Sequence, residues 1–411
     1  MVFLGLLLYT TFIYIRPQEW MAAFIGSPVM NVIGIVTSVF WLIELLTRKR
    51  KIINTPQDSC MILFCLFLVF SHVVWFYFGG AWQAFIDFSK IVLIYLVVST
   101  TVNNIKKFDI FASLLIILTF VLCFQGALQA KTGIGMGGVT PIESRIRALG
   151  IFNDPNDLAL AIVVMVPFVL NILFSRKRLL LKFVSFIVIL FYLYGIYLTN
   201  SRGGILALMV VVAVFFVGKS KKFLWGAITS CVLIMLIFSY GPSRLALLSS
   251  EEVSAYQRID SWYQGFQMLI GSPFLGVGYG MFLSHHFQTA HNSFILVAAE
   301  TGFLGYFTWI AIFYFVIKSS VAIERVSEEL AERSFVLRTG IIGFVAASLF
   351  LSRAYVLLPY LLLGMVTGLV SASRGVNPKL SVSAVPKDYL NILVIGIIVL
   401  TGIYMLMKVA I

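Results

Sequence analysis

The sequence predicts an all-α, polytopic integral membrane protein with about 12–13 transmembrane helices. Of its 411 residues, 60% are hydrophobic and only 11% are charged, and the mean hydropathy is +1.01. These values exclude an ordinary soluble domain. The apolar residues also fall in runs of about 17–25 residues, which is long enough to cross a bilayer as helices. The short alternating segments expected of membrane strands do not occur.

Thirteen apolar runs are candidates for these helices, and we expect residues 1–411 to form a single membrane domain. The first run is short, and it lacks the basic region and small-residue cleavage site of a removable signal peptide. In chain order the runs are 2–15, 28–47, 59–78, 83–101, 108–126, 156–174, 179–198, 203–218, 222–240, 291–317, 335–351, 354–372 and 389–410.

The net charge of +13 is distributed as in a membrane protein rather than a nucleic-acid binder. Twenty of the thirty Lys and Arg residues fall in connections on one side of the predicted spans, and nine fall on the other. The positive-inside rule makes the crowded side cytoplasmic. The N-terminus is then cytoplasmic and, with thirteen spans, the C-terminus lies outside. No nucleic-acid partner is expected.

The longest interruption between apolar runs is 241–290, which we expect to be an extracytoplasmic loop. Within it, residues 256–270 carry apolar side chains every three or four positions, which predicts a helix with one wide aromatic face. Such a helix suits the water–lipid boundary better than a membrane span or a soluble core. We therefore interpret the loop as a catalytic or binding platform on the membrane. The apolar face comprises Tyr256, Ile259, Trp262, Tyr263, Phe266, Leu269 and Ile270.

Two ionisable residues fall inside a predicted span. Asp87 and Lys90 are three residues apart in the run 83–101, and so share one helical face. Ionisable groups at this depth are costly and mark function by default. Opposite charges this close can also neutralise each other. The sequence therefore leaves two readings, a structural ion pair and a role in handling substrate or ions.

The outer loop 127–155 is rich in glycine and carries Arg145 and Arg147. No strand precedes it, so its glycines do not form a nucleotide-binding fingerprint. At its end, Asp154 as N-cap and Pro155 at the first helical position predict a helix start. Capping is a sufficient role for the acidic residues here, and no metal site is expected.

Arg202 occupies a very short outer turn and opens the run 203–218. A cation at a helix N-terminus opposes the helix dipole, at a cost of roughly 0.3–1 kcal/mol when exposed. Gly203 and Gly204 follow and let another group approach. A bound anion reconciles these features, because helix N-termini and arginine both favour phosphate. An arginine that reaches to the membrane interface is the alternative.

Arg258 adds a second outer guanidinium, and Asp260 is in position to orient it. His291 lies where a membrane helix begins, with Asn292 or Ser293 as the cap. The positive end of a helix lowers the pKa of a histidine and favours the neutral imidazole that can act as a base. A structural histidine at the membrane interface is the alternative.

No metal or cofactor site is expected. His285 and His286 are adjacent in the outer loop and point in different directions, so we interpret them as solvated side chains. The cysteines lie in or beside apolar runs without ligand-like spacing, and are interpreted as small core residues. They are Cys60, Cys65, Cys123 and Cys231.

Several of these segments, in their order, resemble the O-antigen ligase and polysaccharide polymerase superfamily. The resemblance covers about 145–305, which we take as an O-antigen ligase-like core, and no single motif in it is diagnostic. It rests on Arg147-Ala148-Leu149-Gly150-Ile151-Phe152-Asn153-Asp154-Pro155-Asn156, on Ser201-Arg202-Gly203-Gly204, and on Arg258, Trp262, Gly265, Pro273, Gly276-Val277-Gly278, His291-Asn292-Ser293, Glu300 and Gly302.

The resemblance implies an inverting, metal-independent membrane glycosyltransferase without a cofactor. Such proteins move a glycan from an undecaprenyl-diphosphate carrier to a saccharide or lipid-linked acceptor, which is the lipid A core for a ligase. By this resemblance Arg202 and Arg258 bind the diphosphate and His291 is the base, with Arg145 and Arg147 as auxiliary residues. It further implies the bacterial cytoplasmic membrane, with the active site on the extracytoplasmic face. Ligases of this superfamily usually have twelve spans and a C-terminus inside, unlike the thirteen counted here.

Two other functions are compatible with the sequence. A polysaccharide polymerase differs from a ligase only in its acceptor, another carrier-linked unit. A transporter or lipid-glycan flippase would use Asp87, Lys90 and Arg202 along a pathway, and predicts inverted repeats and interrupted helices near mid-membrane. The sequence contains no convincing repeat, and its notable polar residues collect at one face.

Overall fold

A computed structural model describes residues 1–48, 51–175, 178–219 and 248–410, together with residues 224–225, 228 and 230–232. Within these residues the elements are helices, with one isolated bridge between Ile142 and Arg145 and no strand. This confirms the predicted all-α fold class. The predicted span 222–240 and the first residues of the predicted loop 241–290 lie mostly outside the described residues.

Twelve of the thirteen predicted spans correspond to helices among the described residues, which makes the chain a multi-pass membrane protein. Ten are long and apolar enough to cross a bilayer, whereas α1 is shorter and α13 begins with charged residues. The helices are α1 (Val2–Ile15), α2 (Val29–Arg48), α3 (Pro56–Val73), α4 (Phe78–Thr101), α5 (Ile105–Thr132), α6 (Pro155–Phe174), α7 (Leu179–Thr199), α8 (Arg202–Lys219), α10 (Leu248–Gly271), α11 (Phe282–His285), α12 (Ser293–Ile323), α13 (Glu328–Ala347), α14 (Leu357–Val376) and α15 (Pro386–Ala410), with short 3-10 turns η1 (Pro17–Glu19), η2 (Met136–Gly138) and η3 (Gly150–Phe152).

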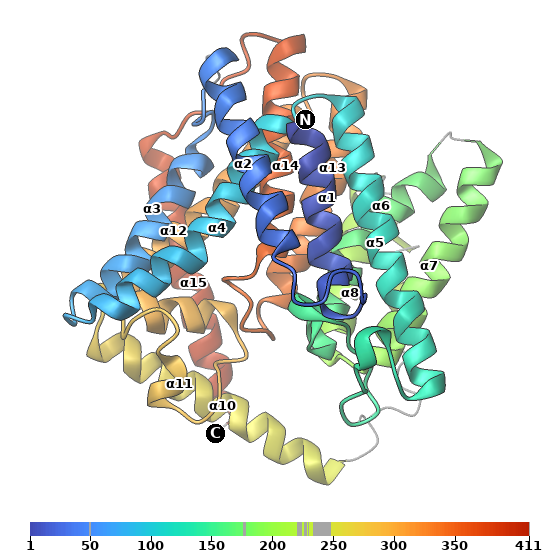
Figure 1. Cartoon of the computed structure of the whole chain (residues 1–411). Helices are drawn as coiled ribbons and strands as arrows, with labels where there is room; N and C mark the ends of the chain where they lie inside the picture. The colour runs from blue at the N-terminus through green and yellow to red at the C-terminus, as the bar shows by residue number, and fades with distance from the viewer. Residues whose placement is uncertain are drawn as a thin grey trace.

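The long helices form an antiparallel bundle with two distinct ends (Figure 1). The N-terminus lies at one end and the C-terminus at the other. The connections 101–105, 323–328 and 376–386 lie at the end with Met1, which we name the basic end. α10 and α11 lie across the opposite end, which we name the α10 end.

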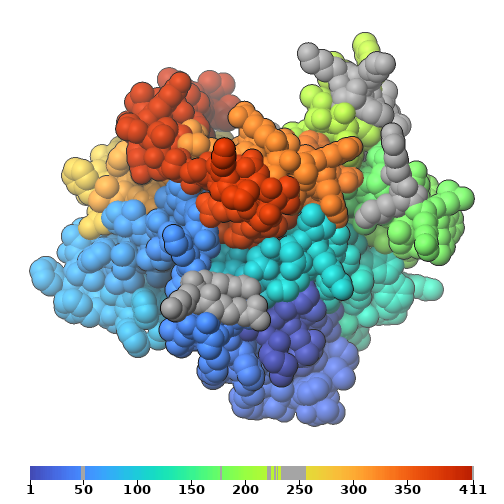
Figure 2. Space-filling view, turned by 90° about the horizontal axis from the view of Figure 1, so that it is seen from above, coloured from blue at the N-terminus to red at the C-terminus, as the bar shows by residue number. Residues whose placement is uncertain are grey.

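The bundle has an apolar perimeter around a packed centre. α6 and α14 are the most buried helices, while α2, α7 and α15 carry mainly exposed apolar side chains, among them Leu46, Leu179 and Ile398. In a membrane protein such side chains face lipid tails, which are as apolar as leucine. Seen from the basic end in Figure 2, blue segments from the start of the chain lie beside orange and red ones from its end. In agreement, α3 packs on α12 and α4 packs on α14.

Of the two readings of Asp87 and Lys90, the structural ion pair is not what the structure shows. Both oxygens of the Asp87 carboxylate accept hydrogen bonds from Gln83 Nε2, at 3.0 and 2.9 Å. Lys90 is exposed on α4, and no ion pair joins it to Asp87 in the part of the chain that the structure describes. Gln83 is one turn before Asp87, so the amide satisfies the carboxylate locally.

α12 is not a continuous helix, because Gly302 adopts φ 62° and ψ −166° inside it. The loop 273–278 fills this break. Phe303 N donates to Pro273 O (2.7 Å) and Leu304 N to Phe274 O (3.3 Å). In return, the amides of Val277 and Gly278 donate to α12 carbonyls on the other side of the break, both at 3.0 Å. Backbone groups freed at membrane depth need such partners.

Glycine is required on both sides of this contact. A Cβ on Gly302 would lie 2.3 Å from the Phe274 carbonyl carbon, and one on Gly276 would lie 2.3 Å from the Glu300 carbonyl carbon. An interrupted helix is a feature that the transporter alternative predicts. In this chain, however, the freed backbone groups bond to the protein's own loop rather than standing open to an ion.

Candidate functional site

The long helices α6, α8 and α12 are among those that begin at the α10 end, so their positive dipole ends meet there. Each start is capped by a side chain. The Asp154 carboxylate accepts from Asn156 N at 2.7 Å in α6, as predicted, and Ser201 Oγ accepts from Gly204 N at 3.2 Å in α8. In α12 the cap is Asn292, which accepts from the next two amides. Converging helix N-termini make this end of the bundle attractive to an anion.

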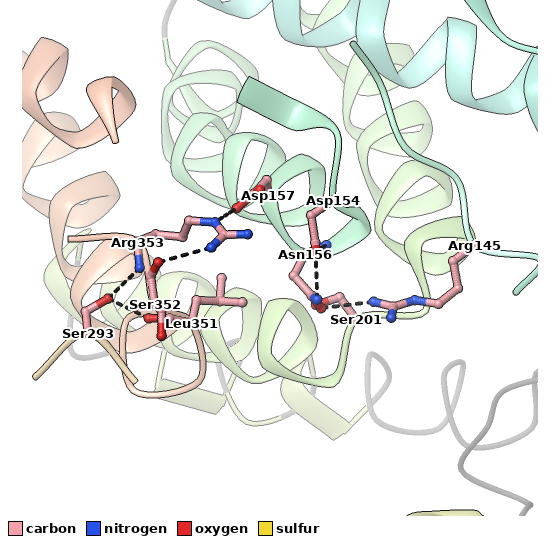
Figure 3. Close-up of polar contacts among 9 residues, drawn as sticks. All are labelled: Arg145, Asp154, Asn156, Asp157, Ser201, Ser293, Leu351, Ser352 and Arg353. Atoms are coloured by element: carbon pink, nitrogen blue, oxygen red, sulfur yellow. Dashed lines mark hydrogen bonds and ion pairs between the residues drawn. The ribbon is translucent and has the colours of Figure 1, made fainter. Parts of the chain in front are cut away.

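A polar cluster joins the Gly-rich loop to the starts of α6 and α8 (Figure 3). Arg145 Nη2 donates to Asn156 Oδ1 at 3.0 Å, and its Nε donates to Thr199 O at 2.8 Å. Ser201 Oγ donates to the same Asn156 oxygen at 2.7 Å. Arg145, predicted as an auxiliary residue, therefore holds the turn that carries Arg202.

The other predicted auxiliary residue, Arg147, bonds within its own loop. Its Nε donates to Thr140 O at 2.8 Å, and its Nη1 donates to Asn153 Oδ1 at 3.1 Å. The backbone amide of Arg147 donates to Gln129 Oε1 at 2.9 Å. These contacts order the loop 127–155 against α5.

An ion pair between Arg353 and Asp157 lies on the other side of α6 (Figure 3). Burial disfavours a charged Arg353, but the carboxylate of Asp157 outweighs this and raises the Arg353 pKa. Arg353 lies in the loop between α13 and α14, and Ser293 fixes that loop to α12. Ser293 Oγ accepts from Arg353 N at 2.9 Å, and Ser293 N donates to Ser348 O at 2.7 Å.

His291 is half-buried directly before the α12 cap and has a left-handed backbone, with φ 48°. Histidine is among the residues that tolerate this region, and the backbone on both sides is fixed. Asn292 caps the helix on one side, and on the other Trp262 Nε1 of α10 donates to Ala290 O at 3.0 Å. The imidazole position is therefore set by α10 and α12 together.

The pKa of His291 is lowered by burial and by the nearby charges of Arg258 and Arg353, while Asp154 acts in the opposite direction. The predicted neutral imidazole agrees with this direction. The cause differs from the predicted one, because two guanidinium groups and burial account for the shift. These interactions also show that residues from α10, from the 348–356 loop and from the start of α6 surround His291.

Arg258 is a half-buried residue of α10 that lies within electrostatic reach of Arg202. Burial, and then the charge of Arg202, lower the pKa of Arg258. Within the described part of the chain, Arg258 has no acidic partner and no hydrogen bond, whereas Arg202 is exposed at the start of α8. The structure thus places Arg258 within electrostatic reach of both Arg202 and His291, which were predicted from distant segments. A half-buried cation beside another cation is unfavourable without an anion to neutralise it.

Asp260 does not orient Arg258. Its carboxylate lies 3.7 Å from His286 Nε2, which is also 3.1 Å from Ser261 Oγ. The prediction that His286 is solvated is wrong as well, since only 6% of its side chain is exposed. His285 is exposed, as predicted, and its Nδ1 lies 3.0 Å from Met281 O. His286 thus fastens α11 to α10.

Arg353 and Asp157 are the parts of this site that the sequence predictions omitted. One signal was available, since Ser352-Arg353 repeats the Ser201-Arg202 dipeptide in another short connection between two apolar runs. Among the described residues, no group of three or more His, Cys, Asp or Glu side chains is arranged to hold a metal ion. Among the described residues, the charged groups that act on the His291 imidazole are the guanidinium groups of Arg258 and Arg353 and the carboxylate of Asp154.

The fold and this cluster together define a multi-pass helical membrane protein with a cationic site at one end of its bundle. Residues 186–310 match the family model described as O-antigen ligase, which supports the resemblance over this part of the chain. The match includes Arg202, Arg258 and His291, and begins after Arg145 and Arg147. No curated protein matches the chain.

Proposed function

We propose that the protein is an inverting, metal-independent glycosyltransferase that moves a glycan from an undecaprenyl-diphosphate carrier to an acceptor hydroxyl. The convergence of Arg202, Arg258 and His291 carries this proposal. Two guanidinium groups supply the charge that a diphosphate leaving group needs, and they suit phosphate geometry better than lysine would. A neutral imidazole beside them supplies the base.

In the proposed reaction, the acceptor oxygen attacks the anomeric carbon of the donor sugar from the face opposite the phosphate. The bond from that carbon to the phosphate oxygen breaks, and the diphosphate leaves with the electron pair. His291 takes the proton of the acceptor hydroxyl. Arg202 and Arg258 stabilise the charge that develops on the leaving oxygen. The two products are the glycoside with inverted anomeric configuration and the carrier diphosphate, and together they contain every atom of the donor.

α10 is suited to present the lipid carrier to this site. Its Ser261, Gly265 and Met268 are buried, whereas Tyr256, Tyr263 and Ile270 are 67%, 41% and 70% exposed. Exposed aromatic and aliphatic side chains on a helix that lies across the bundle end suit the lipid–water boundary. We assign the α10 end to the extracytoplasmic face of the bacterial cytoplasmic membrane, because the basic end carries the excess of Lys and Arg.

The test is transfer by the purified protein from a labelled undecaprenyl-diphosphate glycan, with lipid A core and a carrier-linked unit as separate acceptors. Product on lipid A core identifies a ligase, and a lengthened carrier-linked chain identifies a polymerase. The anomeric configuration of the product tests inversion. Arg202→Ala and Arg258→Ala are each expected to reduce kcat by about 10²–10³-fold, as for the loss of one transition-state donor.

The matched control is Arg325→Ala, which removes an exposed arginine at the basic end and is expected to leave transfer unchanged. Undiminished transfer by both Arg202→Ala and Arg258→Ala would remove the diphosphate clamp from the proposal. Failure of the native protein to use either acceptor, with carrier and glycan matched to the host, would overturn the proposal itself.

A further inference from the structure

A pocket with both polar and apolar lining residues lies at the α10 end, away from the cationic cluster. It has a volume of about 620 Å³ and opens between the turn that joins α3 to α4, the second half of α10 and the loop after it. Pockets of roughly 300–1,000 Å³ are typical of sites for small organic ligands. Its polar lining comprises His72, Trp75, Tyr77, Gln264, Gln267, Ser272 and His285.

The lining carries aromatic faces and amides but no acidic residue, lysine or arginine. Trp75 and Tyr77 are 55% and 54% exposed, so their rings are available to a ligand. Trp75 is fixed in place, because its Nε1 donates to Gly276 O at 3.0 Å. Gln264 and Gln267 form no hydrogen bond with other described residues. An amide offers both donors and acceptors, so two such side chains can each bind a pair of hydroxyl groups.

Of the two histidines in the lining, the exposed His285 adds an acceptor. His72 Nε2 lies 2.9 Å from Tyr279 O, and His285 Nδ1 lies 3.0 Å from Met281 O. A carbonyl can only accept, so each of these ring nitrogens carries the proton. In the neutral imidazole the other nitrogen is then an acceptor, and for the exposed His285 this is Nε2. His72 is only 3% exposed and its Nδ1 faces Gly80 and Gly278, so this histidine shapes the pocket wall. The pocket therefore favours an uncharged ligand with many hydroxyl groups and apolar C–H faces.

Its position on α10 separates this pocket from the reacting centre. Gln264 and Gln267 follow Arg258 by six and nine residues, which is about 9 and 14 Å along the helix axis. Nine residues also rotate Gln267 by about half a turn relative to Arg258, to the opposite side of α10. A ligand here is thus too far from Arg258 to be the sugar whose bond to the diphosphate breaks.

We propose that this pocket is a glycan-binding subsite, which holds saccharide units of a substrate remote from the transferred bond. This inference deepens the proposed function and rests on it for the identity of the substrate. Binding energy from remote units that is equal in ground and transition states lowers KM and leaves kcat unchanged. The subsite therefore favours substrates with longer glycans over those with a single unit.

Binding is tested without turnover, on the full chain in lipid nanodiscs, by tryptophan fluorescence. The probes are two lipid-free oligosaccharides, one released by mild acid from the host's carrier-linked polysaccharide and one released from its lipid A core. A saturable fluorescence change is expected with either probe. The oligosaccharide that binds more tightly identifies whether the donor glycan or the acceptor glycan occupies the pocket. The signal should be lost in Trp75→Phe and retained in Trp82→Phe, an exposed tryptophan of α4 outside the pocket.

A double variant, Gln264→Ala with Gln267→Ala, should weaken binding about tenfold or more, as the loss of two ligand hydrogen bonds predicts. The control is Gln257→Ala, on the same helix, whose side chain bonds to Gln288 instead. In transfer assays the double variant should raise KM for long glycans and leave kcat unchanged.

An unaltered signal in Trp75→Phe, or no binding of either probe, would overturn the subsite. So would an equal signal from phosphatidylglycerol vesicles alone, because lipid would then be the occupant. The two proposals fail separately. Oligosaccharide binding without any transfer rejects only the transferase, and transfer without binding at Trp75 rejects only the subsite.

Discussion

Arg353 donates to the carboxylate of Asp157 and so joins the loop between α13 and α14 to the first turn of α6. The side chains are 26% and 13% exposed, so the pair is largely withdrawn from water. The same loop is bonded to Ser293 at the start of α12. One ion pair therefore holds together two of the helix starts that surround His291.

Asp157→Asn should destabilise the protein by about 1–3 kcal/mol, because it leaves a half-buried guanidinium without its charged partner. The double variant with Arg353→Gln should lose less than the sum of the single variants. Thermal unfolding midpoints in detergent measure all three. The matched control is Asp109→Asn, which breaks an ion pair with Arg333 whose acidic side is 49% exposed. That loss should be about 0–1 kcal/mol, and equal losses at the two pairs would contradict the role given to Arg353.

Activity should fall at low pH as the His291 imidazole becomes protonated. Its pKa is lowered in the folded protein, so the unfolded chain binds more protons between the folded value and the ordinary value of about 6.5. The stability contribution of His291 is therefore present above pH 6.5 and decreases as the pH falls toward the folded pKa. The neutral base is lost over the same acidic range.

The variant Asp154→Asn tests the effect of the Asp154 charge on the pH dependence of activity while it keeps the helix cap. Asparagine caps a helix as well as aspartate does, but it removes the carboxylate that raises the His291 pKa. The acidic limb of the kcat/KM profile should therefore move to lower pH. The control is Arg147→Gln. It removes a charge that does not act on the pKa of His291, so the acidic limb should stay in place. An unmoved limb in Asp154→Asn would reject His291 as the titrating base.

The sequence predicted local features well because they depend on neighbouring residues. Apolar runs gave the helices, and Asp154 was predicted as a cap from its position before Pro155. Arg202, Arg258 and His291 were singled out from their positions in the outer connections, and the family resemblance assigned them to one site. The Arg353–Asp157 pair and the partner of Asp260 were missed, because they depend on helix packing across 196 residues and on the fold of the loop after α10.

The break in α12 was also invisible in the sequence, since Gly302 lies in an apolar run that reads as a continuous helix. Gly302→Ala should destabilise the protein by about 1–3 kcal/mol or more, because the backbone region is strained for alanine and the new Cβ meets the Phe274 backbone. Gly402→Ala is the control, since a Cβ there meets nothing within 4 Å. Because position 402 is exposed and helical, Gly402→Ala should leave the free energy of unfolding unchanged or raise it by up to about 1 kcal/mol. Thermal unfolding in detergent compares the two, and similar midpoints would mean that α12 straightens without loss.

The orientation of the bundle can be measured by cysteine labelling in a variant without the four native cysteines. Ser284 of α11 and Lys408 of α15 are exposed at the α10 end, and Lys379 is exposed at the basic end. If the basic end is cytoplasmic, a membrane-impermeant maleimide should label Ser284→Cys and Lys408→Cys in intact cells. Lys379→Cys should react only after lysis.

The reverse pattern would put the cationic site in the cytoplasm, where the extracytoplasmic transfer proposed here could not occur. Labelling of Ser284→Cys without Lys408→Cys would contradict the four crossings by α12, α13, α14 and α15 that separate these positions, because an even number of crossings returns the chain to the same side.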